Sequence, residues 1–378
     1  MSPPPQRIVH ITEAYPPRPH PIARQVAGLA QRQGERGDAV HVLAATPLTV
    51  AEPGRDRFRT STTDAPGVRV HRLASRLAMG LPVLPRGRAT VERALRLLRP
   101  DVVHLHLPGP SPFAYDAARA TRGLDLPLVI SAYSHSRETF SRFAVRLTGW
   151  ATAPVATSGV TSAVARAAAE IFGDDDARLL PLATPAAAWA QAGRRWRPGA
   201  ELRVLVHADD LARRLAPGLA AAQGAQAIAV TAVGPRAGDV PTADLSLGPA
   251  PHEVIAPLAA DHDVYLSAAS LDPHAAGAAA AGTPLIGPLD SVVRDLVGGG
   301  GIAGEGGARA GGFLVDGPGQ VREGLLALAT SGELYTRMRA AAAASGAAEL
   351  HDWAAVVAGA DELYGLAHER VARFFAGV

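Results

Sequence analysis

The sequence has 378 residues, of which 48% are hydrophobic and 19% charged, so it can bury a sizeable core and is long enough for two domains. It contains no cysteine and no lysine, which excludes disulfide scaffolds, thiol nucleophiles, cysteine-ligated metals, Schiff-base lysines and the P-loop lysine. The formal net charge is only +2. That balance predicts no nucleic-acid partner, which would require basic residues clustered on one face.

The first residues, MSPPPQRIVHITEAYPP, lack the order of basic, apolar and small residues that marks a signal peptide. No stretch reaches the roughly 18–20 uninterrupted apolar residues that span a bilayer. We therefore expect a soluble, cytoplasmic protein without a membrane span.

The first half of the sequence alternates short apolar runs with amphipathic helical patterns. Helices are predicted over 22–36 and 89–99, and strands are predicted at RIVHIT (7–12), AVHVLAA (39–45), VRVHRL (68–73), DVVHLHL (101–107), PLVISAY (127–133) and GVTSAV (159–164). This alternation predicts a doubly wound parallel sheet. The first helix is expected to end at Gly37, because glycine readily adopts the left-handed conformation that ends helices.

A stretch rich in Pro, Gly and Arg (192–201) interrupts the alternation, which then restarts with strands at 202–208, 226–233, 263–268, 284–288 and 311–315. We predict an N-terminal Rossmann-like domain (1–195), a reduced C-terminal Rossmann-like domain (196–350) and a C-terminal helix (351–378) that packs back toward the first domain. Ligands of open α/β sheets bind at the carboxyl ends of strands, so we expect the site in the cleft between the domains.

One corner of the second half has the outline of a ligand site without its charged residues. DVYLSAASLDPHAAGAAAAGTPLI (263–286) predicts a strand, a loop and a helix of alanines that stops at Gly282 and Thr283. Between the strand and that stop, only Asp272 and His274 are ionisable. They could bind a ligand; the alternative is that they start the helix, with Asp272 as its N-cap.

The segment HITEAYPPRPHPIARQVAGLAQRQGERGDAVHVLAA resembles the opening of GT-B glycosyltransferases of the GT4-like (group 1) family. DVVHLHLP, AGTPLIG and HDWAAVVAGADELY are similar to later motifs of that family, in the same order. The resemblance implies the α/β GT-B fold, with two Rossmann-like doubly wound parallel-sheet domains facing across a cleft. It also implies transfer of a sugar from a nucleotide-diphosphate donor to an acceptor, without a cofactor and commonly without a bound metal.

Several positions that carry the family's motifs differ here. The family's phosphate-binding Arg and Lys align with Asp210 and Leu215, its E-x7-E pair aligns near Ala269 and with Gly277, and its first glycine pair aligns with His20 and Pro21. The stretch 234–254 also lacks room for a full helix that usually packs near the nucleotide base. An aspartate in place of an arginine beside a diphosphate would change the interaction energy by roughly several kcal/mol.

Other side chains could supply the chemistry that the resemblance requires. The donor-side candidates are Arg213, Arg214, Asp272, His274, Gly282 and Thr283; the acceptor-side loop contains Glu13, Arg18 and His20; and the weak catalytic candidates are Tyr133 and His135. For the two arginines the alternative is a solvated helix start, and for Tyr133 and His135 it is loop capping.

Two further polar groups are interpreted as structural. Side chains alternate along a strand, so we expect that His104 and His106 do not both face the cleft, and an H-x-H zinc site would need further ligands that are not evident nearby. The triplet Asp174-Asp175-Asp176 is expected to be a solvated loop rather than a metal site.

Three hypotheses remain. The first is a divergent GT4-like glycosyltransferase with a rebuilt donor site, whose partners would be a nucleotide sugar and a glycosyl acceptor. The second is a catalytically inactive homologue that acts as partner or scaffold for an active glycosyltransferase. The third, weaker one keeps the fold and transfers another activated group.

Overall fold

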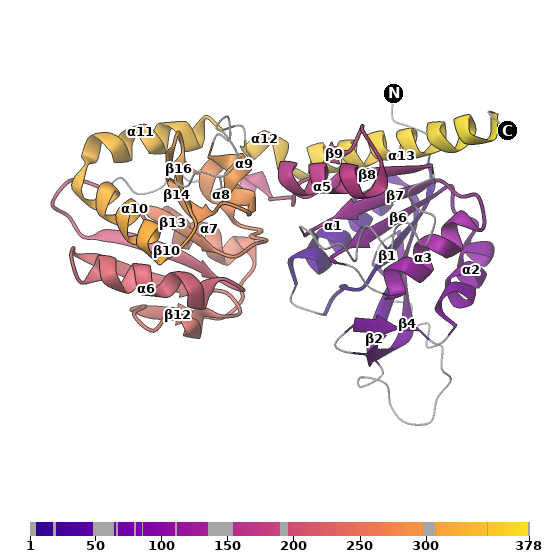
Figure 1. Cartoon of the computed structure of the whole chain (residues 1–378), viewed down its shortest axis with the longest axis horizontal. Helices are drawn as coiled ribbons and strands as arrows, with labels where there is room; N and C mark the ends of the chain where they lie inside the picture. The colour runs from indigo at the N-terminus through magenta and orange to yellow at the C-terminus, as the bar shows by residue number, and fades with distance from the viewer. Residues whose placement is uncertain are drawn as a thin grey trace. The chain divides into compact units, whose positions relative to one another are not determined.

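The computed structural model describes residues 5–17, 20–47, 64–65, 67–78, 81–84, 86–109, 112–134, 154–189, 196–297, 307–345 and 347–376. The chain forms two compact units (Figure 1). The first unit consists of Met1–Pro181 together with Val356–Val378, and the second is the continuous segment Leu182–Ala355. Each unit is a parallel α/β sheet with its own core.

The first unit contains a nine-stranded sheet in the order β3-β4-β2-β1-β6-β7-β8-β9, with β5 paired to β4. Its strands are β1 (Arg7–Thr12), β2 (Ala39–Pro47), β3 (Asp64–Ala65), β4 (Val68–Ala78), β5 (Leu81–Val83), β6 (Val102–Leu107), β7 (Leu128–Ala132), β8 (Val155–Gly159) and β9 (Arg178–Leu179). The pairings are parallel except those of β3 and β5 with β4. The central strands β6, β7 and β8 are almost wholly buried, as expected for a parallel sheet that is covered on both faces.

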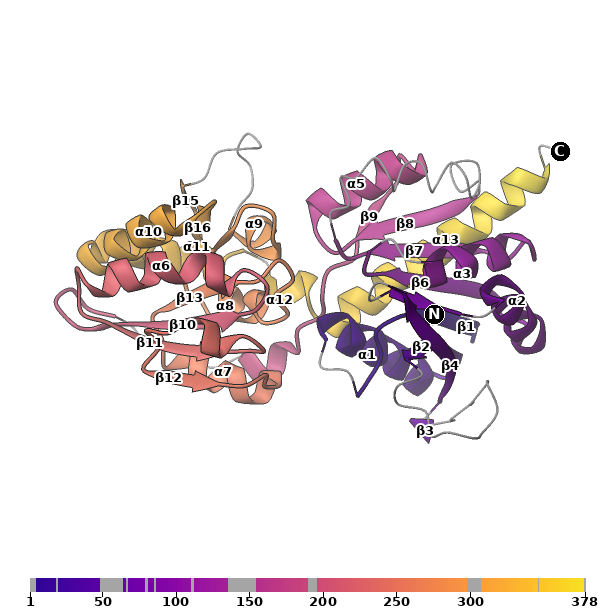
Figure 2. The same cartoon turned by 60° about the horizontal axis from the view of Figure 1, so that its bottom comes forward.

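Helices cover both faces of this sheet; Figure 2 shows α13 passing behind it and α3 in front of it. The described helices are α1 (Pro21–Arg36), α2 (Gly87–Leu98), α3 (Pro112–Arg122), α5 (Ser162–Phe172) and α13 (Trp353–Ala376). The side chain of His20 accepts a hydrogen bond from the backbone of Ile22 and so caps α1, and Pro21 takes the first helical position, where no N–H is needed. The helix ends at Gly37 with φ 106°, which confirms the predicted stop.

The strand predicted over 159–164 is wrong. β8 lies earlier and ends at Gly159, and the side chain of Thr161 accepts a hydrogen bond from the backbone N–H of Val164, which begins α5. A Cβ at Gly159 would overlap the backbone of Ala165, so the chain can turn from strand into helix here only because the residue is glycine. The apolar residues around 159–164 therefore belong partly to β8 and partly to α5.

The second unit contains a seven-stranded sheet in the order β12-β11-β10-β13-β14-β16-β15. Its strands are β10 (Leu202–Ala208), β11 (Ile228–Val233), β12 (Leu245–Leu247), β13 (Val264–Ala268), β14 (Leu285–Pro288), β15 (Gly307–Arg309) and β16 (Gly312–Val315). Its helices are α6 (Ala212–Gln223), α7 (His252–Ala260), α8 (Ala275–Ala280), α9 (Val292–Leu296), α10 (Pro318–Thr330), α11 (Gly332–Ala343) and α12 (Ala347–Leu350), with 3-10 turns at Ala186–Trp189 and Ala237–Asp239.

Two hydrophobic clusters lie on opposite faces of this second sheet. Strand β10 contributes Val204 and Val206 to one cluster and Leu205 to the other, so both faces are covered and the doubly wound prediction is confirmed. In the stretch 234–254, which is fully described, only the 3-10 turn separates β11 from β12; this confirms that no full helix fits there.

Among the described residues, no helix combines the length and the apolar character that crossing a bilayer requires.

Candidate functional site

A polar pocket of the second unit opens at the carboxyl ends of β10, β13, β14 and β16, which is where ligands of parallel α/β sheets bind. It is lined by Leu211, Arg214, Leu215, Ser270, Pro288, Leu289, Asp290, Val315 and Asp316. The two residues that align with the family's phosphate-binding Arg and Lys are both found at this pocket. Leu215 lines it, and Asp210 binds the lining residue Ser270.

Asp210 ties two loops of this pocket together. Its carboxylate accepts hydrogen bonds from the backbone N–H of Ser270 at 2.9 Å and from the Ser270 hydroxyl at 2.6 Å. The residue that stands where the family carries an arginine is thus engaged in holding the loop after β13. Leu215 is 3% exposed and packs in the core beneath the pocket.

The two arginines that begin α6 differ in where they lie. Arg213 forms an exposed ion pair with Asp239, and Nε lies 3.1 Å from the carboxylate. Arg214 lines the pocket, where its guanidinium donates to the carbonyl oxygen and the carboxylate of Asp316. The side chains of Arg214 and Asp316 are both more than half exposed. Arg214 is the one arginine among the described residues that line this pocket.

The helix α8 has no room for the family's second glutamate. A Cβ built on Gly277 would overlap the indole of Trp189, which is itself buried and donates from Nε1 to Nδ1 of His252 at 3.3 Å. Ala269, the approximate position of the first glutamate, is fully buried. The space beside α8 is therefore filled by an aromatic side chain that the sequence reasoning did not single out.

The ionisable residues of this corner are buried beneath it. Asp272 accepts hydrogen bonds from the hydroxyl of Tyr265 at 3.1 Å and from the backbone of His274 at 2.8 Å. The N-cap of α8 is His274, so Asp272 holds the turn before the helix and is not its N-cap. His274 is 1% exposed and its ring lies against those of Trp189 and His252. Gly282 has φ +75°, and Thr283 after it is buried.

The candidates of the first unit follow the ends of β1 and β7. Glu13 comes directly after β1 and is partly buried, and His20 caps α1. Tyr133 follows β7, but its hydroxyl points inward and lies 3.0 Å from Nδ1 of His106. Arg18 and His135 lie outside the described residues.

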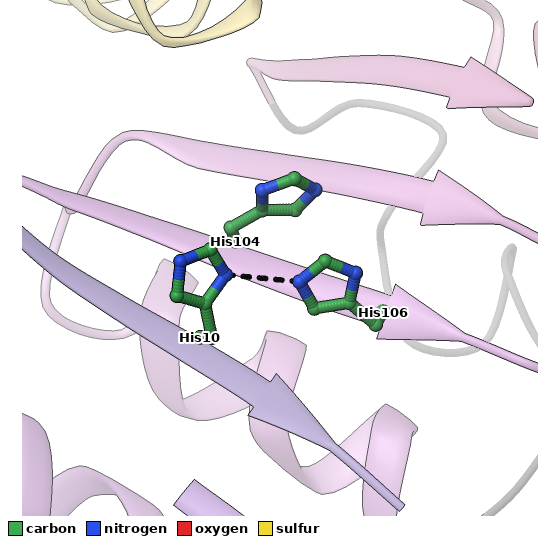
Figure 3. A group of neighbouring side chains, drawn as sticks. All are labelled: His10, His104 and His106. Carbon is green, nitrogen blue, oxygen red and sulfur yellow. Dashed lines mark hydrogen bonds between the residues drawn. The ribbon is translucent and has the colours of Figure 1, made fainter. Parts of the chain in front are cut away.

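Figure 3 shows three histidines in the core of the first unit, with their rings gathered above β1 and β6. The expectation that His104 and His106 alternate across the strand is wrong, because residues two apart on a strand point to the same side. Both side chains are buried in the core, which agrees with their interpretation as structural residues. Their ring centroids lie 4.1 Å apart. His10 pairs with His104 across the parallel strands and supplies a third imidazole, which the sequence reasoning missed.

All six ring nitrogens of these histidines have hydrogen-bond partners. Gln33 sets the direction: its Oε1 accepts from Nε2 of His10 at 2.7 Å, and its Nε2 donates to the hydroxyl of Tyr364 at 2.9 Å. When all rings are neutral and every buried hydroxyl also donates, one order of donors results. Tyr133 donates to His106, His106 donates to His10, His10 donates to Gln33, Gln33 donates to Tyr364, Tyr364 donates to His104, and His104 donates to Ser131, which is bonded to Ser158. We call these eight residues the histidine network.

Burial keeps the network neutral. It lowers the pKa of His10 to about 4, against a smaller opposing effect of the Gln33 hydrogen bond, and it lowers the pKa values of His104 and His106 well below their usual value. Burial likewise raises the pKa of the Tyr133 hydroxyl. The three imidazoles thus stay neutral and the Tyr133 hydroxyl stays protonated, as this order of donors requires.

Three imidazoles whose ligand atoms lie within 4.8 Å of one another could in principle hold a metal ion. A chelate requires in-plane lone pairs that converge on one point. His106 instead stacks on His104 and on His10, with interplanar angles of 24° and 27°, and the rings of His10 and His104 are tilted by 38°. The observed arrangement fits a stacked hydrogen-bond network and does not fit a three-histidine metal site without rotation of the rings.

The aspartate triplet was expected to be solvated, and for Asp174 this is wrong. Asp174 is 2% exposed and accepts hydrogen bonds from Thr157, from the backbone of Asp176 and, at 2.6 Å, from Arg370 on α13. Burial alone would raise the pKa of this carboxyl, but the bonds from Arg370 and Thr157 hold it below its usual value. Asp175 and Asp176 are exposed.

Comparison with known proteins places this architecture. A glycosyltransferase from Rickettsia africae ESF-5 has a TM-score of 0.66 at 11% identity, over 96% of this chain and 98% of that chain. HepE of Anabaena, determined in complex with UDP and glucose, has a TM-score of 0.62 at 12% identity, over 94% and 98%. The protein has the GT-B fold.

Sequence comparison points to one group within that fold. The model of the family described as Glycosyltransferase Family 4 matches residues 22–184. A GDP-mannose-dependent alpha-mannosyltransferase from Mycobacterium tuberculosis (strain CDC 1551 / Oshkosh) is 33% identical over 126 residues, which are 32% of this chain and 31% of that protein. The match thus spans about a third of the curated relative's length. The chain thus has the GT-B fold, and within it residues 22–184 are similar to the Glycosyltransferase Family 4 model.

Proposed function

We propose that the protein is a divergent GT4-like glycosyltransferase that transfers a sugar from a nucleotide-diphosphate donor to an acceptor, and that the pocket at the carboxyl ends of β10, β13, β14 and β16 is its donor site. The observation that carries this proposal is Arg214, a cation in that pocket one residue before the buried Leu215, where the family has its lysine. We propose that Arg214 takes the role of the family's phosphate-binding Arg and Lys and neutralises the leaving diphosphate.

The ion pair of Arg214 with Asp316 does not prevent this role. Exposed pairs contribute only about 0–1 kcal/mol, because water screens them and side-chain entropy opposes them. A diphosphate carries more charge than one carboxylate and offers a guanidinium two oxygens at once. Breaking the ion pair itself would therefore cost little, whereas the carboxylates of Asp316 and Asp290, which also line the pocket, would oppose diphosphate binding. The loop of Glu13, Arg18 and His20 is proposed as the acceptor side.

Calorimetry with UDP, GDP, ADP and TDP tests this proposal on the full-length protein. At least one nucleotide should bind with micromolar affinity, and Arg214→Ala should weaken that binding by roughly tenfold or more, as expected for a charge-assisted contact. Arg213→Ala is the matched control, because Arg213 pairs with Asp239 and does not line the pocket. The proposal fails if no nucleotide binds at millimolar concentration, or if both variants weaken binding equally.

A second candidate function is an inactive homologue that serves as partner or scaffold for an active glycosyltransferase. Two contacts favour it: Asp210 is engaged with Ser270, and Trp189 fills the space beside Gly277. This candidate predicts that the wild type binds no nucleotide, whereas a protein that carries both Asp210→Arg and Leu215→Lys gains affinity. It also predicts that the chain raises the activity of a glycosyltransferase with an intact E-x7-E pair encoded nearby. No such rise, or wild-type nucleotide binding, would exclude it.

A further inference from the structure

The surface of helix α2 is strongly basic. Five arginines on or beside the helix are exposed, namely Arg86, Arg88, Arg93, Arg96 and Arg99. The buried side of the helix carries Val91 and Leu95, so the arginines occupy its solvent face. Glu92 pairs with Arg96, and the charges of Arg88 and Arg119 act on the carboxyl of Asp116 on α3, so two acidic groups reduce the positive charge of this face. Basic residues are thus clustered on one face, although the net charge of the whole protein is small.

Helix α3 extends this basic face. Both views place α3 between α2 and the end of α13 (Figures 1 and 2). The two helices are in contact, and at Gly123, the residue after α3, an added Cβ would lie 3.1 Å from the guanidinium of Arg88. Arg119 and Arg122, in the last turn of α3, are exposed as well.

Large apolar side chains are exposed beside these arginines. Leu97 at the end of α2 is 75% exposed, and Phe374 and Phe375 at the end of α13 are 46% and 49% exposed. The two phenylalanines line a groove together with Arg122, at the end of α3, and with Leu126 and the exposed acidic residue Asp125, which follow that helix. Among its described residues, the first unit exposes four large hydrophobic side chains. Three of them are Leu97, Phe374 and Phe375, and the fourth is Leu179.

This surface lies at the edge of the sheet where the strands begin. Arg7, the first residue of β1, donates to the carbonyl oxygens of Leu98 and Arg99 at the end of α2. The groove also includes Leu128 and Val155, the first residues of β7 and β8. The ligand side of a parallel sheet is the opposite edge, so this surface is separate from the candidate acceptor side.

We propose that this surface, formed by the arginines of α2 and α3 together with Leu97, Phe374 and Phe375, docks on an anionic lipid surface. Arginines attract anionic headgroups, and exposed aromatic and aliphatic side chains enter the boundary between headgroups and acyl chains. A nucleic acid could pair with the arginines and stack on the phenylalanines, but it offers Leu97 no apolar medium. The protein would bind to the surface of the bilayer without crossing it, and this does not depend on the proposed glycosyl transfer.

Cosedimentation of the full-length protein with vesicles tests the proposal. Vesicles of phosphatidylcholine with about one third phosphatidylglycerol should bind the protein, pure phosphatidylcholine should not, and high salt should weaken the binding. Arg93→Glu with Arg99→Glu should reduce the affinity about 30-fold or more, because each arginine near an anionic surface contributes roughly fivefold. Phe374→Ser with Phe375→Ser should also reduce it.

The matched control is Arg322→Glu with Arg337→Glu, which makes the same charge change at exposed positions of the second unit. It should bind vesicles almost as well as the wild type, and a thermal melt of each variant reports whether it is folded. The proposal is overturned if the wild type does not bind the anionic vesicles, or if the control loses as much affinity as the α2 variant. It is also overturned if single-stranded DNA binds more tightly than the vesicles and the phenylalanine substitutions leave vesicle binding unchanged.

Discussion

His10 and His106 face each other across neighbouring strands, with Nδ1 of the first 2.9 Å from Nε2 of the second, inside a core that admits no water-exposed surface for either ring. His10 also bonds Gln33, so it cannot gain a proton without breaking its hydrogen bond to His106, and a charge on either ring would be buried away from water. The network is therefore sensitive to acid.

The unfolding free energy should fall as the pH is lowered from 6.5 toward 4. An unfolded histidine has a pKa near 6.5, whereas burial lowers the pKa of folded His10 to about 4. Between these values the unfolded chain binds more protons, so stability that is fully present above pH 6.5 is progressively lost. For His10 alone the loss is about 3 kcal/mol by pH 4, of which about 2 kcal/mol falls between pH 7.5 and pH 5. Urea unfolding at pH 7.5, pH 5 and pH 4 measures it.

A control separates the network from the second histidine pair. His41 and His71 form a half-buried contact on β2 and β4, and burial lowers both of their pKa values. Replacing both by glutamine should leave most of the acid dependence in place. An unfolding free energy that is flat between pH 7.5 and pH 5 in the wild type would contradict the neutral network.

Tyr364→Phe should destabilise the first unit by about 2 kcal/mol or more. The substitution removes a hydroxyl that accepts from Gln33 and donates to His104, and it leaves two buried polar groups without that partner. Tyr115→Phe on α3, at a half-buried site outside the network, should cost less. Denaturant unfolding of both variants measures the difference; equal losses would show that the network hydroxyl has no special role.

Two arginines on one helix should differ strongly in their effect on stability. Arg370→Gln leaves the buried Asp174 without its cation and should lower the unfolding free energy by about 3 kcal/mol or more. Arg373→Gln, one turn further along α13, breaks only an exposed pair with Glu369 and should cost about 0–1 kcal/mol. Thermal and urea unfolding of the two single variants compare them directly. A similar loss in both would argue that Asp174 is well solvated.

Gly277→Ala should destabilise the second unit, because the new methyl group overlaps the indole of Trp189. We expect a loss of about 1–3 kcal/mol. The matched control is Gly365→Ala in α13, where an added Cβ meets nothing and alanine should stabilise the helix by up to about 1 kcal/mol. A double-mutant cycle with Trp189→Ala should show strong coupling, and strictly additive effects would rule out the overlap.

Strand positions were largely predictable, because central parallel strands are near-continuous apolar runs that periodicity detects. β1 was found to the residue, and β6 and β7 to within one residue at each end. The failure at 159–164 arose where one apolar run serves two elements and the boundary depends on a capping threonine and a close-packed glycine. Neither signal has a periodicity.

The site was less predictable, because its contacts join residues far apart in the sequence. Asp210 could be recognised as a replacement, but not as the partner of Ser270, sixty residues later. Trp189 could not be connected with Gly277 without the fold. His10 is the exception: parallel pairing of two predicted strands would have placed it beside His104, had the two-residue period been applied correctly.

The position of Tyr364 has a consequence for biosynthesis. The first unit is discontinuous, since its core requires residues from the end of the chain as well as from the beginning. A ribosome synthesises the second unit, a continuous segment, before the hydroxyl that closes the histidine network exists. The imidazoles of β1 and β6 therefore cannot be fully buried until α13 has left the ribosome. Truncation within α13 should accordingly impair the folding of the first unit and leave the second unit folded, although the second unit is nearer in sequence to the deleted residues.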